Sequence, residues 1–130
     1  MAKIERFEDI KAWQTARELC KQIHLLTQKE SFSRDYRLIG QIKGSSGSVM
    51  DNIAEGFERN GNREFIQFLS IAKGSSGETR SQLYRALDNN YITKEEFDST
   101  FRLAEEASRM ISSFMQYLNQ TDIKGTKFKL

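Results

Sequence analysis

The sequence has no proline, one cysteine and one histidine in 130 residues. All-β chains usually carry glycine and proline between short alternating runs, so long stretches without proline favour an all-helical chain. A single cysteine excludes an internal disulfide and fits a reducing compartment. Cys20 and His24 lie four positions apart on one predicted helix, and two ligands do not complete a metal site. We therefore predict ordinary packing and no metal at these two residues. For the whole chain we predict no cofactor and no enzyme activity, because no spacing of residues argues for a catalytic site.

Strong net charge and long apolar runs are also missing. The formal net charge is +2, which is too small to imply nucleic-acid binding, although a local basic patch could still provide it. No window approaches the roughly eighteen apolar residues of a membrane span. The opening "MAKIERFEDIKAW" has no continuous apolar run and no cleavage site. We expect a cytoplasmic protein without a signal peptide and without membrane association.

Nine Phe, four Tyr and one Trp are enough for one packed core. Apolar residues recur at spacings of three and four along four segments, which is typical of amphipathic helices. The segments are Glu8–Gln28, Asp35–Arg59, Arg63–Asn89 and Lys94–Asn119. The polar connections between them are short. We predict an all-α fold, an antiparallel up-down-up-down four-helix bundle over residues 1–120, followed by a basic tail over residues 121–130.

The stretch "KGSSG" occurs twice, at Lys43–Gly47 and Lys73–Gly77. Each glycine inside a helix costs roughly 1 kcal/mol relative to alanine. A P-loop is excluded because lysine precedes glycine and no strand is expected. In an antiparallel hairpin the two stretches lie at the same level, so we predict a close helix crossing and an ion pair between Lys43 and Glu78. The predicted crossing residues are Gly44, Gly47, Gly74 and Gly77.

The stretch from Ser48 to Glu78 resembles the family of 23S rRNA intervening-sequence proteins. The family pattern is an Asn-Ile-Ala-Glu-Gly core, an Arg, then Glu-Phe-Ile-x-Phe-Leu-x-Ile-Ala and a Gly-Ser pair before a Glu. It is matched at Asn52–Gly56, Arg59, Glu64–Ala72, Gly74–Ser75 and Glu78, and the opening Phe7–Ala16 also looks like the first helix of the family. The family commonly has proline before the Asn and in the first loop, and this chain has none.

The resemblance implies a small helical bundle that forms a ring-like homo-oligomer, a pentamer. Some family members are encoded inside insertions within 23S rRNA genes, and the biochemical function of the family is not established. The chain is also similar to the accessory proteins of diversity-generating retroelements. Those proteins are basic pentameric bundles that engage nucleic acid and reverse transcriptase.

Several polar residues fall within or beside the matched motif. Asn52 and Glu55 are either contacts to a ligand or RNA, or members of a polar network that fixes the helix register. We favour the network, and we interpret Glu78 and Lys43 in the same way.

The stretch "FIQFLSIA" (Phe65–Ala72) is apolar most of the way round a helix. Ile66 and Ile71 point away from the stripe that faces the bundle. We therefore predict that both residues contribute to an interface between subunits of a homo-oligomer.

The basic residues are scattered. Arg59 and Arg63 cluster at one turn, and the others of interest, Lys124, Lys127 and Lys129, lie on the tail. In a ring they would repeat around one rim and bind phosphates, whereas in a single chain a solvated turn and tail are the better interpretation. The functional hypothesis is a non-enzymatic homo-oligomer that associates with RNA or DNA, and RNA is the favoured partner. The alternative is a protein-interaction scaffold that binds no nucleic acid.

Overall fold

The protein is all-helical. The computed structural model covers 130 residues, of which it describes residues 4–121. A short 3-10 helix, η1 (Phe7–Asp9), precedes four α-helices, which are α1 (Lys11–Thr27), α2 (Tyr36–Glu58), α3 (Asn62–Asp88) and α4 (Lys94–Gln120). Within residues 4–121 there is no strand, and no helix is long and apolar enough to cross a membrane. The all-α prediction is confirmed, and no predicted helix end differs by more than three residues.

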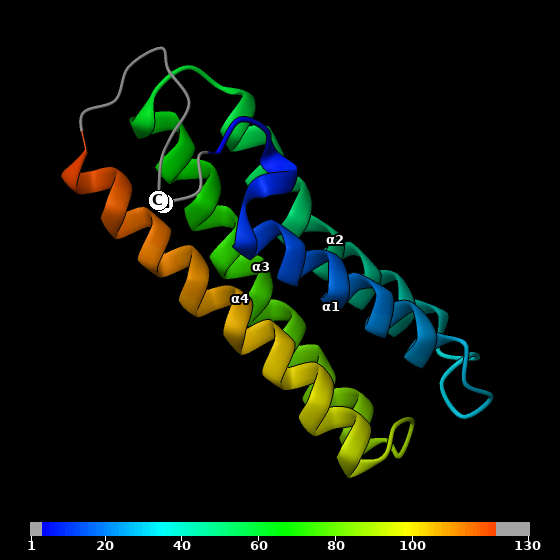
Figure 1. Ribbon diagram of the computed structural model, residues 1–130. Coiled ribbons are helices and arrows are strands. Elements are labelled where there is room, and N and C mark those ends of the chain that lie inside the picture. Colours follow the sequence, from blue (N-terminus) through cyan, green and yellow to red (C-terminus); the bar gives the residue numbers. More distant parts are fainter. Residues whose placement is uncertain (1–3, 122–130) are drawn as a thin grey trace.

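The helices form an up-down-up-down bundle (Figure 1). Each of α1 and α3 packs against both α2 and α4, so α1 and α3 lie diagonally across the bundle. The turn between α2 and α3 lies at one end, and the α1–α2 and α3–α4 connections lie at the opposite end (Figure 1). Of the predicted tail over residues 121–130, only Thr121 is described, and the predicted contact residues Lys124, Lys127 and Lys129 lie outside the described part of the chain.

Side-chain caps mark the starts of α2 and α4. The Asp35 carboxylate accepts a hydrogen bond from the Leu38 N–H at 3.0 Å. The Thr93 hydroxyl accepts one from the Glu96 N–H at 3.1 Å, while the Glu96 carboxylate accepts the Thr93 N–H at 2.8 Å. This reciprocal pair is a capping box. Both caps lie at the opposite end from the α2–α3 turn.

The α2–α3 turn depends on a glycine and an asparagine. Gly61 has a φ of +107°, which favours glycine over residues with a side chain. Asn62 is the first residue of α3, and its side chain does not cap that helix. Its amide nitrogen donates instead to the Leu118 carbonyl at 2.9 Å and to the Thr121 carbonyl. The start of α3 is thereby tied to the end of α4.

Two apolar clusters fill the bundle. The Phe65 cluster lies toward the α2–α3 turn and contains the buried rings of Phe57, Phe65 and Phe114. The Phe97 cluster lies toward the opposite end and contains the buried rings of Phe32 and Phe97. Aliphatic side chains surround both sets of rings, among them Val49, Ile53, Leu69 and Ile111 in the first cluster and Leu19, Ile23, Ile42 and Leu83 in the second.

A layer of small polar side chains separates the two clusters. We call it the serine layer, and its members are Ser45, Ser48, Ser75, Ser76, Thr79, Gln82 and Ser108. Between α2 and α3, the Ser45 hydroxyl lies 2.8 Å from the Thr79 hydroxyl and donates to the Gln82 side-chain oxygen at 2.6 Å. Because both helices contribute polar atoms that must be satisfied, these bonds favour a single register of α2 against α3.

The serine layer continues into the α3–α4 contact. The Ser76 hydroxyl donates to the Ala104 carbonyl at 2.7 Å, and the Ser108 hydroxyl donates to Ser76 at 3.2 Å. Ser75 lies 2.8 Å from Ser48 across the α2–α3 contact. Neighbouring serines of the second "KGSSG" stretch therefore bond to different helices, because successive helical residues point about 100° apart.

The prediction of a close crossing through the four glycines is wrong. A Cβ atom on Gly44, Gly47 or Gly74 would meet no described atom within 4 Å, and on Gly77 it would meet only an Arg80 side-chain nitrogen at 3.5 Å. The two "KGSSG" stretches do lie at the same level, as the Ser48–Ser75 contact requires. However, it is the serines that face the neighbouring helices, and the glycines point outward.

The glycine at a close approach is Gly56. A Cβ atom there would lie 2.7 Å from Phe68 Cβ and 2.8 Å from Phe65 Cδ1. The backbone of α2 therefore packs directly on two phenylalanines of α3 just before the turn. Only glycine leaves room for this contact.

Candidate functional site

The α2–α3 turn carries the two arginines that the sequence places there. Arg59 is neutralised within its own chain, since its guanidinium pairs with Glu55 at 2.7 Å and with Glu64 at 3.9 Å. It also lies over the Phe68 ring, 5.0 Å from the centroid. Arg63 is exposed and has no ion-pair partner among residues 4–121. Phosphate binding by Arg59 would compete with two carboxylates, so the turn offers one free cation rather than two.

The polar residues of the matched motif do not form one network. Asn52 donates to the Ser48 carbonyl and hydroxyl, both at 2.8 Å, and thus joins the serine layer. Glu55 pairs with Arg59 on the surface. The predicted ion pair between Lys43 and Glu78 is absent from the described part of the chain, where both residues are exposed.

The two isoleucines predicted at a subunit interface have different surroundings. Ile66 is half-buried and packs against the Phe65 cluster of its own chain. Ile71 leaves 53% of its surface exposed. They are five positions apart along α3, which places them roughly 140° apart around the helix. A single flat interface therefore cannot centre on both, and Ile71 is the more available of the two.

Four other cations lie at matching levels on the neighbouring helices α3 and α4. We call this surface the α3–α4 cationic face, and its members are Lys73, Arg80, Arg102 and Arg109. Within each helix the two cations are seven residues apart, which repeats the same side of the helix about 10 Å further along. The hydrogen bonds of Ser76 with Ala104 and Ser108 place both pairs at the same levels of the bundle.

These four cations form no ion pair with any residue of the range 4–121, and only Arg80 is partly buried. The Arg80 guanidinium lies back along α3 beside Gly77, 3.5 Å from the position that a Cβ atom would take. Its Nε is buried and has no hydrogen-bond partner within the described chain. Glu105 and Glu106 are half-exposed acids between the two arginines of α4, so the four cations face two acids at these levels. The face therefore carries an excess of positive charge.

Sequence reasoning missed this surface because it ranked cations by proximity along the chain. The signal was present in the seven-residue spacings from Lys73 to Arg80 and from Arg102 to Arg109. Only the register between α3 and α4 places the two pairs together.

Three groups with shifted pKa values lie at the end of the bundle that is opposite the α2–α3 turn. The Leu38 backbone N–H and the Tyr91 hydroxyl, which donates at 2.8 Å, lower the pKa of Asp35. The same hydrogen bond raises the pKa of Tyr91. The ammonium of Lys29 lowers the pKa of Glu96, with a further contribution from the Thr93 backbone. These contacts link the α1–α2 connection to the α3–α4 connection and the start of α4. We therefore assign them a structural role.

Cys20 and His24 line a shallow hollow on α1 together with Arg17, Lys21 and Leu25. The Cys20 thiol donates to the Ser46 carbonyl at 3.2 Å, and burial raises its pKa. Residues 4–121 contain no cluster of three or more potential metal ligands.

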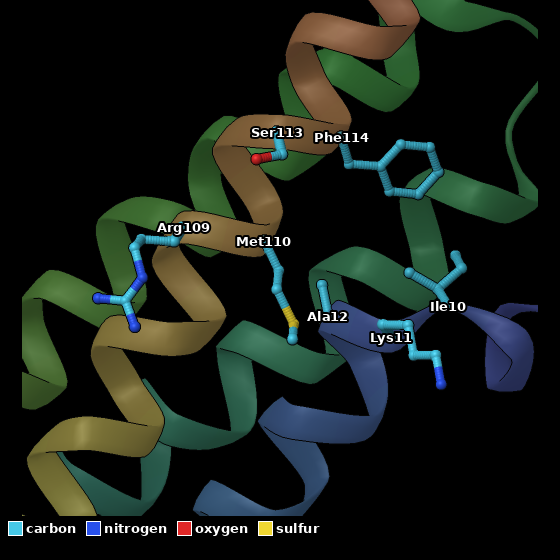
Figure 2. A pocket seen from close by; sticks show the side chains of 7 residues that line it. All are labelled: Ile10, Lys11, Ala12, Arg109, Met110, Ser113 and Phe114. Carbon is cyan, nitrogen blue, oxygen red and sulfur yellow. The ribbon is translucent and has the colours of Figure 1, made fainter. Parts of the chain in front are cut away.

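A better-formed groove lies between α1 and α4, near the α2–α3 end (Figure 2). Its volume is about 380 Å³. Met110 reaches from α4 toward Ala12 of α1, and Lys11 and Arg109 extend outward at opposite ends of the row of side chains (Figure 2). The Thr15 hydroxyl contacts the Met110 sulfur at 3.4 Å beside the groove.

Comparison with known protein families gives a match over most of the bundle. The family model for the 23S rRNA-intervening sequence protein matches residues 8–113. The chain belongs to this family. No curated protein sequence matches the chain. The family resemblance inferred from the motif around Asn52 is thereby confirmed.

Among solved structures, this family member is similar to a protein of unknown function from Bacteroides thetaiotaomicron, described as belonging to the S23 ribosomal protein family. The TM-score is 0.75 at 24% sequence identity, and the match covers 81% of this chain and 98% of the other. At this identity the similarity shows a shared fold. Neither the family match nor the neighbour carries an assigned activity.

Proposed function

We propose that this protein is a non-enzymatic, homo-oligomeric bundle of the cytoplasm that associates with RNA. The observation that carries the proposal is the α3–α4 cationic face, where four positive side chains lie without ion-pair partners among the described residues. Nucleic-acid backbones are bound chiefly by lysine and arginine through release of condensed counterions. A net charge of +2 for the whole chain is compatible with RNA binding, because binding depends on the local concentration of positive charge on this face.

Arg80 is the most informative residue of the face. A guanidinium has five N–H donors in a planar fork that suits phosphate oxygens. In Arg80 the Nε is buried without a partner in the described chain, and the guanidinium lies over Gly77, where no side chain interferes. A phosphate that approaches over Gly77 would satisfy the Nε donor after the Arg80 side chain turns outward, because that atom is buried in the conformation described. The outward position of Gly77 is consistent with such an approach.

The name of the family supports RNA as the partner, since it refers to intervening sequences of 23S rRNA. Arg63 and the tail residues Lys124, Lys127 and Lys129 remain predicted contributors. Arg59 contributes less than the sequence suggests, because Glu55 and Glu64 neutralise it.

Assembly would multiply a weak contact. One cationic face with about four phosphate contacts gives low affinity, and several copies on one particle raise the effective affinity through avidity. Ile71 on α3 is 53% exposed, and beside it the outward glycines leave the backbone of α2 and α3 accessible. This surface is our candidate for contact between subunits, and the family resemblance implies five of them.

RNA binding is tested by titrating a structured RNA into the full chain at several salt concentrations. With about four phosphate contacts, the slope of log K against log salt is expected to be about −3 per engaged subunit. The variant Arg102→Gln should weaken binding uniformly across sequences and reduce the slope by about 1. The control Lys21→Gln removes the same charge from α1, where Lys21 pairs with Glu18 at 3.2 Å, and should change little.

The competing function is a protein-interaction scaffold. Absence of RNA binding at low salt, or equal losses for Arg102→Gln and Lys21→Gln, would favour the scaffold. A parallel comparison with Arg63→Gln separates the turn from the cationic face.

Assembly is tested independently by light scattering coupled to size exclusion. A mass near 15.1 kDa, that of one chain, would contradict oligomerisation. Ile71→Glu should dissociate the assembly while leaving helicity nearly intact. The substitution Ser70→Glu, one position earlier on an exposed residue, is the matched control.

A further inference from the structure

The groove between α1 and α4 has an apolar floor. Ile10, Ala12 and Phe114 are members of the Phe65 cluster whose surfaces border the groove, and Met110 lies along it. Methionine is unbranched and polarizable, so it adapts to ligands of irregular shape. The volume of about 380 Å³ falls within the range usual for small-molecule sites.

The rim of the groove is positively charged. Lys11 and Arg109 are both exposed, and neither has an ion-pair partner within residues 4–121. Ser113 adds a hydroxyl that makes no hydrogen bond to the described part of the chain. No acidic side chain of residues 4–121 is among those that line the groove. An apolar floor with cations at its rim is complementary to a molecule that is apolar over its length and negative at one end.

We propose that this groove binds a small amphipathic carboxylate of the medium-chain fatty-acid type. The hydrocarbon chain would lie along Met110 between α1 and α4, and the carboxylate would reach Arg109 or Lys11 at the rim. Charge-assisted hydrogen bonds to such cations are the stronger kind. The groove is a separate site from the RNA surface, although Arg109 borders both.

The probe is octanoate, with 1-octanol as the uncharged molecule of equal chain length. The readout is a methyl spectrum of the full chain labelled at the methionine methyl groups. Met110 lies in the groove, whereas Met50 lies on α2 and packs against the Phe65 cluster, so it serves as an internal control. We expect octanoate to shift the Met110 signal saturably, with a Kd on the order of 0.1–1 mM. Octanol should bind more weakly, and Met50 should move little.

Charge variants separate this proposal from RNA binding. Lys11→Gln should weaken octanoate binding by roughly threefold to fivefold, as expected for one exposed ion pair, and leave RNA binding unchanged. Arg102→Gln should weaken RNA binding and leave octanoate binding unchanged. Arg109→Gln should weaken both.

Three results would overturn the proposal. Octanoate could leave the Met110 signal unmoved, it could move Met50 and Met110 alike, or its binding could be indifferent to both Lys11→Gln and Arg109→Gln. A Met110 signal that shifts with protein concentration alone would assign the groove to a second copy of the chain instead.

Discussion

The two halves of the core are stabilised in different ways. In the half near the α2–α3 turn, the contacts are those of close packing: Phe65 lies edge-on to Phe57 and Phe114, with ring centroids 6.0 Å and 5.2 Å away. At the opposite end, polar contacts join the connections around the Phe97 cluster. Asp35 bonds to Tyr91 and Lys29 pairs with Glu96. Ion pairs occur at both ends, but those of Arg59 stay at the surface of the α2–α3 turn, whereas at the opposite end polar contacts join separate connections of the bundle.

The serine layer allows this difference. It interrupts the apolar core at mid-bundle, so neither cluster extends through the whole length of the helices. Each cluster can then respond to a perturbation that leaves the other unchanged. Substitutions in the two halves and in the serine layer should therefore differ in their effects on the free energy of unfolding and on its pH dependence.

The largest expected effect is in the tightly packed half. Gly56→Ala places a methyl group 2.7 Å from Phe68 Cβ, and overpacking of this kind costs about 1–3 kcal/mol. The matched control is Gly44→Ala, whose Cβ would meet no described atom within 4 Å, and which should stabilise by about 0.5–1 kcal/mol through helix propensity. Urea unfolding measures both. Equal effects of the two substitutions would contradict the assignment of Gly56 as the close approach.

An intermediate effect is expected in the serine layer. Thr79→Val keeps the shape but removes the hydroxyl that contacts Ser45 and donates to the Ser75 carbonyl at 2.9 Å. The free energy of unfolding should fall by about 1–2 kcal/mol, since buried partners lose a hydrogen bond. The control Ser81→Ala changes an exposed hydroxyl two residues away. A layer that merely fills space would leave Thr79→Val as stable as the parent protein.

The smallest effect concerns pH and the charged half. The pKa values of Asp35 and Glu96 are lowered in the folded protein from their ordinary values of 3.8 and 4.5. A lowered folded-state pKa means that the stabilisation is present above these values and is lost as the pH falls below them. Both residues are partly exposed, and solvent screens their charges, so the loss should be modest.

The measurement is hydrogen exchange at pH 7 and near pH 3. Protection at the α1–α2 and α3–α4 connections should fall more than protection around Phe65. Asp35→Asn should reduce this pH dependence. A uniform loss of protection along the chain would show that the two halves do not respond separately.

Several features of this protein were determined by the sequence alone. The spacing of apolar residues predicted four helices and their ends to within three residues. The motif around Asn52 identified the family. These features depend on residues that are close in sequence, where helical periodicity and capping chemistry act directly. The equal level of the two "KGSSG" stretches also followed, because a short turn fixes how two helices pair.

The tertiary structure decided which face each residue presents and which distant residues meet. Ser45 and Ser76 face the neighbouring helices, whereas the sequence-based prediction assigned the contact to the glycines beside them. One position of shift turns a side chain by about 100°, which is enough to exchange the inside of a helix with its surface. The pairing of Lys73 and Arg80 with Arg102 and Arg109, and the groove beside Met110, required the packing of separate helices. Local periodicity carries no information about the register between helices, since that register is set by side chains that interlock across the core.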